Sequence, residues 1–361
     1  MKVIFSGGGT LGSVTPLVAI AEDLKTMENG VEFLWLGTKG GPEKKIVEES
    51  GIKFKPIFSG KLRRYLSLWN IVDLFLIKIA IWQSLFVIIK EKPDLVVSAG
   101  GFVAVPVVFA SWLWGVPVFL HQQDFRAGLA NKLCAPFAKK ITVALEKSLD
   151  DYSKKKTTWV GNPARKLSCP EEKARKVFDL DKKKPVVLIL GGGTGSIGIN
   201  KLVINSLEKI LKFSQVIHLT GGKEKAKGSL SGDVKKMDNY YPYEFLVKEM
   251  ACAYAVADVV VTRAGMGVLT ELASLEKPAI LIPLAGHQEE NAKYFAEKKA
   301  VIVLKERGLT PEKLAGEIEK LLKDKKTQNA LSENIKKVFP LSPEKSAEKI
   351  ADIILGVVRK E

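Results

Sequence analysis

Two glycine-rich loops are candidate ligand-binding segments, because each follows a short apolar run and opens a helix-like segment. Residues 6–13 read SGGGTLGS after the run KVIF, and residues 191–196 read GGGTGS after the run PVVLIL. Glycine at a strand-to-helix turn lets the backbone approach a ligand closely and leaves the first N–H groups of the helix free to face an anion. One such loop is a weak signal, since many α/β domains turn on glycine for packing alone. Two loops at matching places predict two similar domains facing each other across a cleft, one suited to a nucleotide-linked donor.

A third candidate segment, residues 262–272, reads TRAGMGVLTEL and follows the apolar run at 259–261. Its small residues can lie against a ligand, and the start of its helix favours a diphosphate. Glu271, about two turns further on, can accept hydrogen bonds from both hydroxyls of a ribose. Its apolar neighbours argue against a merely solvated residue, because an unpaired buried carboxylate is costly. Arg165, after Asn162-Pro163, can neutralise phosphate, although an exposed linker arginine explains it equally well.

Polar residues follow two further apolar strands. Residues 121–124 read HQQD, and Asp124 is a candidate general base because a carboxylate at the rim of a site can accept a proton from a hydroxyl nucleophile. His121 is better explained as a partly buried structural histidine, and His218 is also better explained as structural. Residues 287–292, HQEENA, can hold sugar hydroxyls through their amides or can simply cap a helix.

Metal chemistry has little support in the sequence. Residues 179–181 read DLD, which formally matches the DxD pattern of metal-dependent sugar transferases. They lie in a charged connector followed by three lysines, so a solvated turn is the better interpretation. No His/Cys cluster has metal-ligand spacing. A departing nucleoside diphosphate would then be stabilised by helix dipoles and Arg165, and we expect no cofactor.

The elements that position these residues alternate between apolar strands and amphipathic helices, which predicts an α/β fold with doubly wound parallel sheets. Ligands of such sheets collect at the carboxyl ends of the strands. Strands are expected at residues 2–5, 31–36, 53–57, 94–98, 116–120, 140–143, 186–190, 216–219, 259–262, 279–282 and 301–303. Helices with clear boundaries are expected at residues 16–27, 43–50, 66–90 and 345–358.

Length and composition set broader limits. A chain of 361 residues with 46% hydrophobic residues suits two domains with full cores. Three widely spaced cysteines (Cys134, Cys169 and Cys252) are typical of reduced thiols in a cytosolic protein. No signal peptide is evident, and the apolar stretches 71–89 and 102–120 are interrupted too often to span a membrane.

The net charge of +16 favours an anionic partner, or else reflects a solvated lysine-rich surface. Residues 62–89 combine basic residues with Trp69, Trp82 and many bulky aliphatic residues. That composition fits a surface resting on anionic lipid, and a core helix with a basic rim is the alternative. Nucleic acid is not an expected partner, since no recognition module appears.

Over nearly its whole length the sequence resembles the MurG family of N-acetylglucosaminyltransferases. The order and spacing of the matching blocks are more specific than any single glycine motif. These blocks are residues 8–16, 100–106, 121–124, 127–132, 161–165, 191–195, 250–255 and 263–271.

The resemblance implies a GT-B fold of two Rossmann-like domains with an interdomain cleft. Residues 1–162 would form an N-terminal domain for the acceptor and the membrane, residues 163–342 a C-terminal domain for UDP-GlcNAc, and residues 343–361 a helix that crosses back. The implied reaction moves GlcNAc from UDP-GlcNAc to the 4-hydroxyl of lipid-linked MurNAc-pentapeptide with inversion, converting lipid I to lipid II in peptidoglycan synthesis. The implied location is peripheral, at the cytoplasmic face of the plasma membrane.

The resemblance also implies roles for individual residues. The donor would be bound by Thr10, Gly12, Arg165, Gly193, Thr194, Gly195, Leu246, Met266, Gly267, Val268, Glu271, His287 and Gln288. The acceptor would be bound by Gly9, Gly100, Gly101, Asp124 and Asn131.

The sequence departs from the family pattern at the reacting centre. The histidine that usually ends the first loop is Ser13 here, which cannot act as a base near neutral pH, and a glycine of that loop is Leu11. The usual HEQN is HQQD, so an aspartate is gained at Asp124. We therefore name Asp124 and Ser13 as the catalytic candidates, with Asp124 taking over or sharing activation of the acceptor hydroxyl. The alternatives are a UDP-GlcNAc 2-epimerase-like isomerase and a catalytically impaired relative that binds nucleotide sugar or lipid.

Overall fold

The computed structural model describes residues 1–9, 12–60, 69–164, 167–192, 195–222 and 237–359, with the backbone alone for residues 69–72 and 74. The chain divides into two compact units. Unit 1 comprises Met1–Arg165 and Phe339–Glu361, and unit 2 comprises Lys166–Val338.

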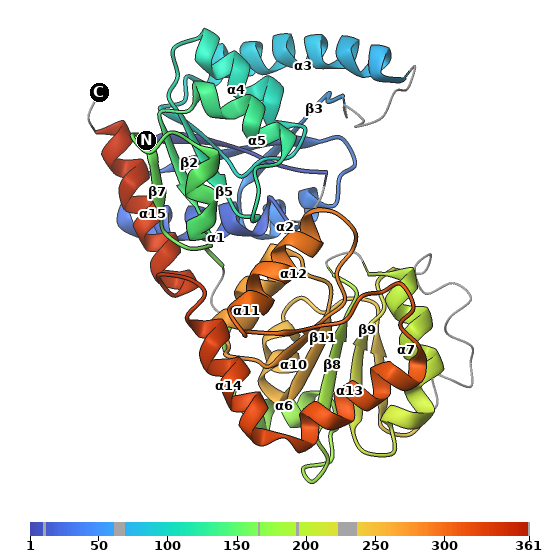
Figure 1. Cartoon of the computed structure of the whole chain (residues 1–361). Helices are drawn as coiled ribbons and strands as arrows, with labels where there is room; N and C mark the ends of the chain where they lie inside the picture. Colours follow the sequence, from blue (N-terminus) through green and yellow to red (C-terminus); the bar gives the residue numbers. More distant parts are fainter. Residues whose placement is uncertain (10–11, 61–68, 165–166, 193–194, 223–236, 360–361) are drawn as a thin grey trace. The chain divides into compact units, whose positions relative to one another are not determined.

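A seven-stranded sheet, parallel throughout, forms the centre of unit 1 (Figure 1). Its order is β3-β2-β1-β4-β5-β6-β7. The strands are β1 (Lys2–Ser6), β2 (Glu32–Thr38), β3 (Lys53–Ile57), β4 (Leu95–Ser98), β5 (Val118–Gln122), β6 (Lys140–Val143) and β7 (Thr157–Trp159). The helices are α1 (Thr15–Met27), α2 (Glu43–Glu49), α3 (Trp69–Glu91), α4 (Ala104–Leu113), α5 (Leu129–Cys134) and α15 (Pro343–Val358), with short 3-10 helices at Ala135–Phe137 and Glu146–Asp151.

Both faces of this sheet are buried, because successive residues of a strand point to opposite faces. On β1, Val3 and Phe5 join a core with α1 and α15, whereas Ile4 joins a second core with α3 and α4. Side chains from α1 and α15 fill the first core, including Leu17, Ile20, Ile350 and Ile354. Figure 1 shows α15 lying beside α1. The near-continuous apolar runs of the strands are what a parallel sheet covered on both faces requires.

Unit 2 repeats this plan with a six-stranded parallel sheet in the order β10-β9-β8-β11-β12-β13. The strands are β8 (Val186–Leu190), β9 (Gln215–Leu219), β10 (Tyr240–Tyr243), β11 (Val259–Thr262), β12 (Ala279–Leu281) and β13 (Ile302–Val303). The helices are α6 (Glu171–Val177), α7 (Ile197–Ile210), α10 (Met250–Val256), α11 (Met266–Ser274), α12 (His287–Glu297), α13 (Pro311–Lys323) and α14 (Lys325–Lys336).

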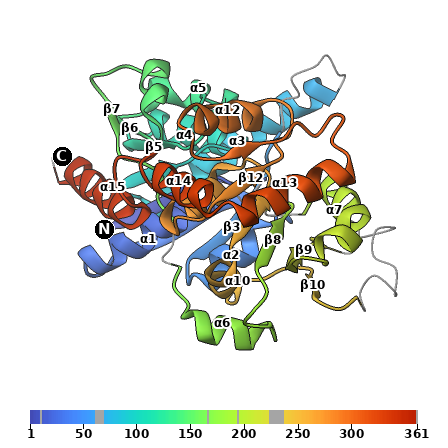
Figure 2. The same cartoon turned by 60° about the horizontal axis from the view of Figure 1, so that its bottom comes forward.

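One face of the second sheet is covered by α7 and α13, which lie side by side in Figure 2. Val187, Ile189 and Val261 of the sheet pack there against both helices. Leu188 and Val260, which point to the opposite face, are equally buried. Two doubly wound parallel sheets confirm the predicted fold class.

The strands that the sequence prediction missed lie at sheet edges. β10 contains Pro242, and a proline within a run argues against a central strand but is tolerated at an edge. β7 has only three residues, too few to show a pattern. Both are the last strand at one side of their sheet.

The prediction of reduced thiols is wrong for two of the three cysteines. Cys169 and Cys252 form a disulfide with a Cα–Cα distance of 5.0 Å. They are 83 residues apart in sequence, and the packing of α6 against α10 brings them together. Cys134 is buried and free, and burial raises the pKa of its thiol to about 12.

Candidate active site

The glycine loops lie at corresponding places in the two sheets. In unit 1, β1 lies between β2 and β4, and in unit 2, β8 lies between β9 and β11. The chain leaves the central strand to opposite sides at these switch points, so a crevice opens at the carboxyl ends of the strands. Residues 7–13 follow β1 and residues 99–101 follow β4. The matching loops of unit 2 follow β8 and β11.

A cavity of about 120 Å³ lies at the switch point of unit 1. It is enclosed by the end of the first glycine loop, the loop after β4, the turn after β5 and the start of α5. Its lining residues are Ser13, Ala99, Gly100, Gly101, Gln122, Gln123, Asp124, Gly128, Ala130 and Asn131. The structure thus brings together five of the residues predicted from the sequence: Ser13, Gly100, Gly101, Asp124 and Asn131.

Three buried polar atoms of this cavity have no hydrogen-bond partner among the described residues. They are Ser13 Oγ, Gln123 Oε1 and Asn131 Oδ1. Buried polar atoms without partners are rare in folded proteins, because each loses its hydrogen bonds to water without replacement. Three such atoms on residues that line one cavity favour a polar ligand group there.

The backbone around Asp124 is held by hydrogen bonds from two buried side chains. Gln122 Nε2 donates to the carbonyl oxygens of Asp124 and Arg126 at 2.8 and 2.9 Å. The Ser148 hydroxyl donates to the Phe125 carbonyl at 2.9 Å. The half-buried Asp124 side chain therefore stands at the cavity on a fixed turn.

His121 and His218 are structural, as predicted. The Nε2 of His121 lies 2.8 Å from Asn162 Oδ1, and its Nδ1 lies 3.0 Å from the Thr142 hydroxyl. Because Asn162 Oδ1 is an acceptor, Nε2 carries the hydrogen in this contact. Burial lowers the pKa of His121 to about 4 and that of His218 to about 3.

In the first glycine loop, the Gly9 N–H is directed at a carboxylate of the protein itself. It donates to Glu43 Oε2 at 3.3 Å. Gly12 is exposed. Thr10 and Leu11 lie outside the described residues.

In unit 2, the second glycine loop packs closely against the end of β9. Gly195 has φ of +79°, and a methyl group there would lie 2.6 Å from the Thr220 carbonyl oxygen. Ser196 caps α7 by accepting from the Ile199 N–H at 3.4 Å. Gly193 and Thr194, together with Arg165, lie outside the described residues.

A buried guanidinium ties this loop to β11. Arg263 Nη2 donates to Ser196 Oγ at 2.8 Å and to Glu306 Oε1 at 2.7 Å. Arg263 Nη1 donates to Glu306 Oε2 at 2.9 Å. A bidentate ion pair of this kind fixes the orientation of both side chains. The sequence prediction treated Arg263 only as part of a motif, and its pairing with Glu306, 43 residues away, had no local signal.

Helix α11 begins after three residues that follow β11, and its N-cap residue, Gly265, provides no side-chain cap. Met266 is buried, and Gly267 and Val268 are half-buried in its first turn. Further along the helix, the Tyr254 hydroxyl donates to Glu271 Oε2 at 2.8 Å. Glu271 is therefore a hydrogen-bonded carboxylate rather than a solvated one.

Three further predicted donor residues follow other strands of the same sheet, Leu246 after β10 and His287 and Gln288 after β12. Gln288 Oε1 accepts from the Leu284 N–H at 3.1 Å, whereas His287 is exposed. Leu246 is half-buried and lies between β10 and α10. Because the sheet is parallel, the segments carrying these residues start at the carboxyl ends of their strands, as α11 does.

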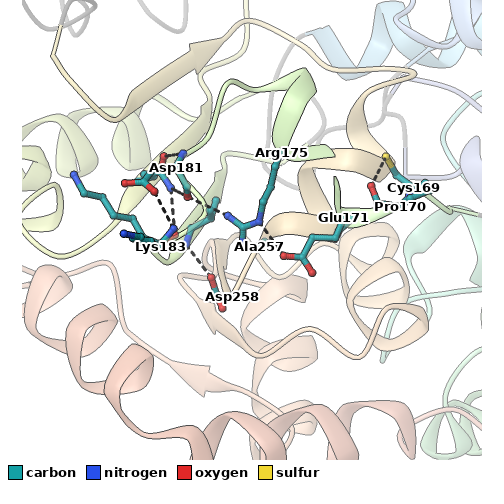
Figure 3. Close-up of polar contacts among 12 residues, drawn as sticks. Cys169, Pro170, Glu171, Arg175, Asp181, Lys183, Ala257 and Asp258 are labelled. Atoms are coloured by element: carbon teal, nitrogen blue, oxygen red, sulfur yellow. Dashed lines mark hydrogen bonds and ion pairs between the residues drawn. The ribbon is translucent and has the colours of Figure 1, made fainter. Parts of the chain in front are cut away.

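Asp179 and Asp181 of the DLD segment are exposed, as the predicted solvated turn requires, whereas Leu180 is buried. Asp181 leads into a turn at residues 182–183 (Figure 3). Asp181 Oδ1 accepts from the Lys183 N–H at 2.9 Å, and the Asp181 carbonyl accepts from Arg175 Nη1 at 3.2 Å. Arg175 also pairs with Glu171 through a 2.9 Å contact. Nowhere in the described part of the chain do three His, Cys, Asp or Glu side chains group as a metal site would require.

Comparisons with known proteins cover both units. Residues 3–143 match the model of the glycosyltransferase family 28 N-terminal domain, and residues 186–351 match that of the family 28 C-terminal domain. A Clostridium kluyveri protein named UDP-N-acetylglucosamine–N-acetylmuramyl-(pentapeptide) pyrophosphoryl-undecaprenol N-acetylglucosamine transferase is 39% identical over 333 residues, covering 90% of this chain and 92% of the relative. A Clostridium tetani protein of the same name is 36% identical over 366 residues, covering 99% and 98%.

Solved structures share the fold. MurG of Acinetobacter baumannii superposes with a TM-score of 0.72 at 24% identity, covering 98% of this chain and 99% of that one. The UDP-GlcNAc 2-epimerase of Neisseria meningitidis also gives 0.72, at 14% identity and full coverage of both chains. The fold alone therefore does not distinguish transferase from epimerase, whereas the sequence identity does. On that identity, the chain belongs to the MurG family of N-acetylglucosamine transferases.

Proposed function

We propose that this protein transfers GlcNAc from UDP-GlcNAc to the 4-hydroxyl of lipid-linked MurNAc-pentapeptide, with inversion at the sugar carbon. Relatives that carry the name of this activity match 90–99% of the chain at 36–39% identity. The observation that carries the proposal in the structure is the unit 1 cavity, where Asp124 shares the lining with three residues whose buried polar atoms have no partner in the described part of the chain.

The acceptor is assigned to this cavity. Ser13, Gln123 and Asn131 would hold polar groups of the acceptor sugar, and Gly9, Gly100 and Gly101 allow its close approach. Asp124 would take the proton from the 4-hydroxyl as the oxygen attacks C1 of GlcNAc. The bond between C1 and the UDP oxygen breaks as the new bond forms on the opposite face, and UDP leaves.

Most of the donor contacts are assigned to unit 2. The uncapped N-terminus of α11 presents backbone N–H groups at Met266, Gly267 and Val268, which suit the diphosphate. Glu271 would accept from the ribose hydroxyls, and the backbone of Leu246 would contact uracil. The remaining donor residues assigned by resemblance are Thr10, Gly12, Arg165, Gly193, Thr194, Gly195, His287 and Gln288. Helix dipole and guanidinium together would stabilise the departing diphosphate without a cofactor.

An anionic membrane surface is the proposed third partner, and its contact is assigned to α3. Phe75, Trp82 and Phe86 have exposed fractions of 65%, 73% and 66%. Spacings of seven and four residues place them on one stripe of the helix. Trp112 and Trp114, at the end of the adjacent α4, are also about half exposed, at 50% and 53%.

The opposite stripe of α3 is buried at Ala80, Ser84, Val87 and Ile88. Apolar side chains on a monomer surface are usually scattered, so a stripe of aromatic residues marks a contact surface. Within the described residues, none of the helices has the length and apolar character needed to cross a membrane. We propose peripheral association at the cytoplasmic face, with the basic residues near 62–68 outside the described part of the chain.

The test is a transfer assay with UDP-GlcNAc and a lipid I analogue, with the product linkage determined by NMR. We expect a β-1,4-linked disaccharide and one UDP per transfer. Incubation with UDP-GlcNAc alone is the control. Conversion of the sugar nucleotide without acceptor would instead show an epimerase, and binding without turnover would show an impaired relative.

A further inference from the structure

Glu43 is a carboxylate buried beneath the first glycine loop. It is the first residue of α2, and its side chain is 0% exposed. Its Oε1 accepts from the Thr38 N–H at 2.6 Å and also from the Thr38 hydroxyl. Its Oε2 accepts from the Gly9 N–H. A carboxylate can be buried only when hydrogen bonds replace its hydration, so these donors define where it sits.

The surrounding backbone is shaped to admit this carboxylate. A methyl group at Gly8 would overlap Glu43 Oε1, and one at Gly41 would overlap Glu43 Oε2. A methyl group at Gly8 or Gly41 would therefore displace the carboxylate from its hydrogen-bonded position, and at Gly41 it would also overlap the Thr38 hydroxyl. The β2–α2 turn and the loop after β1 meet at this one group.

Gly9 is confined on a second side as well. It has φ of +79°, and a methyl group there would overlap the ring of Phe102. A methyl group at Gly101 would lie 2.8 Å from the Gly8 carbonyl oxygen and 3.4 Å from Ser13 Oγ. The two loops thus fit against each other, and both contribute to the cavity that contains Ser13 and Gly101.

We infer that Glu43 is a positioning residue for the acceptor site, acting through the Gly9 N–H on residues 7–9, which pack against Gly101 and Ser13 of the cavity wall. The inference rests on the proposed function, because it takes the unit 1 cavity as the place where the acceptor binds. Glu43 does not line this cavity, so its effect on the acceptor passes through the loop.

Glu43→Gln separates this role from simple structural support. In the glutamine variant, the amide oxygen should stay hydrogen-bonded to the N–H and hydroxyl of Thr38. These two contacts are shorter than the contact to the Gly9 N–H, which is 3.3 Å long in the wild type. The amide NH₂ then faces the Gly9 N–H, and two donors cannot pair. The variant keeps the shape of the side chain and the Thr38 contacts, yet loses the contact to the loop.

The experiment measures kcat and both KM values of the full chain with UDP-GlcNAc and a soluble lipid I analogue. For Glu43→Gln we expect the KM of the acceptor to rise about ten-fold, as for loss of a hydrogen bond to a charged group. The KM of UDP-GlcNAc should rise much less, because only Thr10 and Gly12 of its proposed contacts lie on this loop. Glu43→Asp, which keeps the charge but shortens the reach to Gly9, should shift the same constant. Circular dichroism verifies that each variant is folded.

Two controls set the baseline. Thr38→Val removes a donor from the same carboxylate without touching Gly9, so it should lower the melting temperature and leave the KM of the acceptor within two-fold. Glu49→Gln, at the exposed end of α2, should change neither.

The outcomes are distinct. Suppose that the wild type transfers GlcNAc. The inference alone is then overturned if both Glu43 variants leave the acceptor KM within two-fold, or if they raise both KM values equally. If the wild type does not transfer GlcNAc, the affinity for a fluorescent derivative of the lipid I analogue is measured instead. Weaker binding by both Glu43 variants than by the wild type then supports the inference without the proposed function. No binding by the wild type overturns both.

Discussion

The Tyr254 hydroxyl donates a hydrogen bond to Glu271 Oε2 at 2.8 Å. Tyr254 lies on α10 and is buried, and Glu271 lies on α11. The bond links helices on either side of β11 in the sequence, and it orients the carboxylate assigned to the ribose. A carboxylate has more than one lone pair per oxygen, so this bond leaves acceptor capacity for two hydroxyls.

Tyr254→Phe should weaken donor binding. The ring still fills its site, but Glu271 loses one orienting bond, and we expect the Kd for UDP to rise about three- to ten-fold. Calorimetric titration of UDP measures this directly, and kcat at saturating donor should be retained. Tyr241→Phe is the matched control. Tyr241 lies on the edge strand β10, and its hydroxyl donates to the Asp179 carbonyl rather than to Glu271. Equal affinities for UDP in both variants and the wild type would show that the bond orients nothing.

Asp124→Asn should lower kcat far more than Ser13→Ala. Loss of a general base typically costs about 10²–10⁴-fold, whereas a serine hydroxyl has no comparable basicity near neutral pH. Steady-state transfer assays with the lipid I analogue measure both variants. Equal and small losses would reject Asp124 as the base. A larger loss from Ser13→Ala would assign the critical hydrogen bond to Ser13 instead.

Replacing Trp82 and Phe86 with alanine should reduce binding to vesicles that contain anionic phospholipid. Each exposed aromatic residue that inserts contributes about 1.5–3 kcal/mol, so we expect about ten- to hundred-fold weaker partitioning for each. Vesicle sedimentation gives the partition coefficient. Activity on a soluble acceptor analogue is the internal control and should be unchanged. Equal partitioning of wild type and double variant would remove α3 from the proposed membrane contact.

The disulfide between Cys169 and Cys252 should leave one titratable thiol, that of Cys134, in the denatured, non-reduced protein. Reduction should lower the melting temperature, because the closed loop restricts the unfolded chain by up to about 4.5 kcal/mol in the entropic model. Differential scanning calorimetry with and without dithiothreitol measures the change. In the Cys169→Ser/Cys252→Ser variant the reductant should have no effect. Three titratable thiols in the untreated protein would contradict the pairing.

Stability should fall below pH 6.5. Burial lowers the pKa of His121 to about 4 from 6.5, so the unfolded chain binds a proton in this interval that the folded chain does not. The stabilisation is complete above pH 6.5 and is lost as the pH falls toward 4, and His218 acts in the same direction. Melting temperatures across this range measure the effect. His121→Gln should flatten the decline, and an unchanged slope would assign it to other groups.

Much of the fold could be predicted because its strands are apolar runs buried on both faces. Strands β3, β6, β8 and β11 have the predicted boundaries. The cavity residues could be found for a related reason, since the carboxyl ends of parallel strands meet at one edge. Asp124 and Asn131 are seven residues apart, yet both reach the same cavity because a turn and the start of α5 separate them.

The contacts that support the site could not be predicted. Glu43 stands in a helix with the composition EKKIVEE, where nothing distinguishes it from the solvated glutamates beside it. Its burial depends on the glycines of two other segments. Arg263 and Glu306, like Cys169 and Cys252, meet only because distant segments pack together, and a single sequence carries no signal for such pairs.

The return of α15 to unit 1 has a consequence for how the protein is made. Ser346 Oγ donates to the Val160 carbonyl at 2.8 Å, and Ile350 and Ile354 complete the core over α1. These residues leave the ribosome only after all of unit 2 has been translated. Throughout that interval the nascent first unit exposes an uncovered apolar face. We expect ribosome-associated chaperones to bind this apolar face during synthesis, and we expect the first unit to finish folding last.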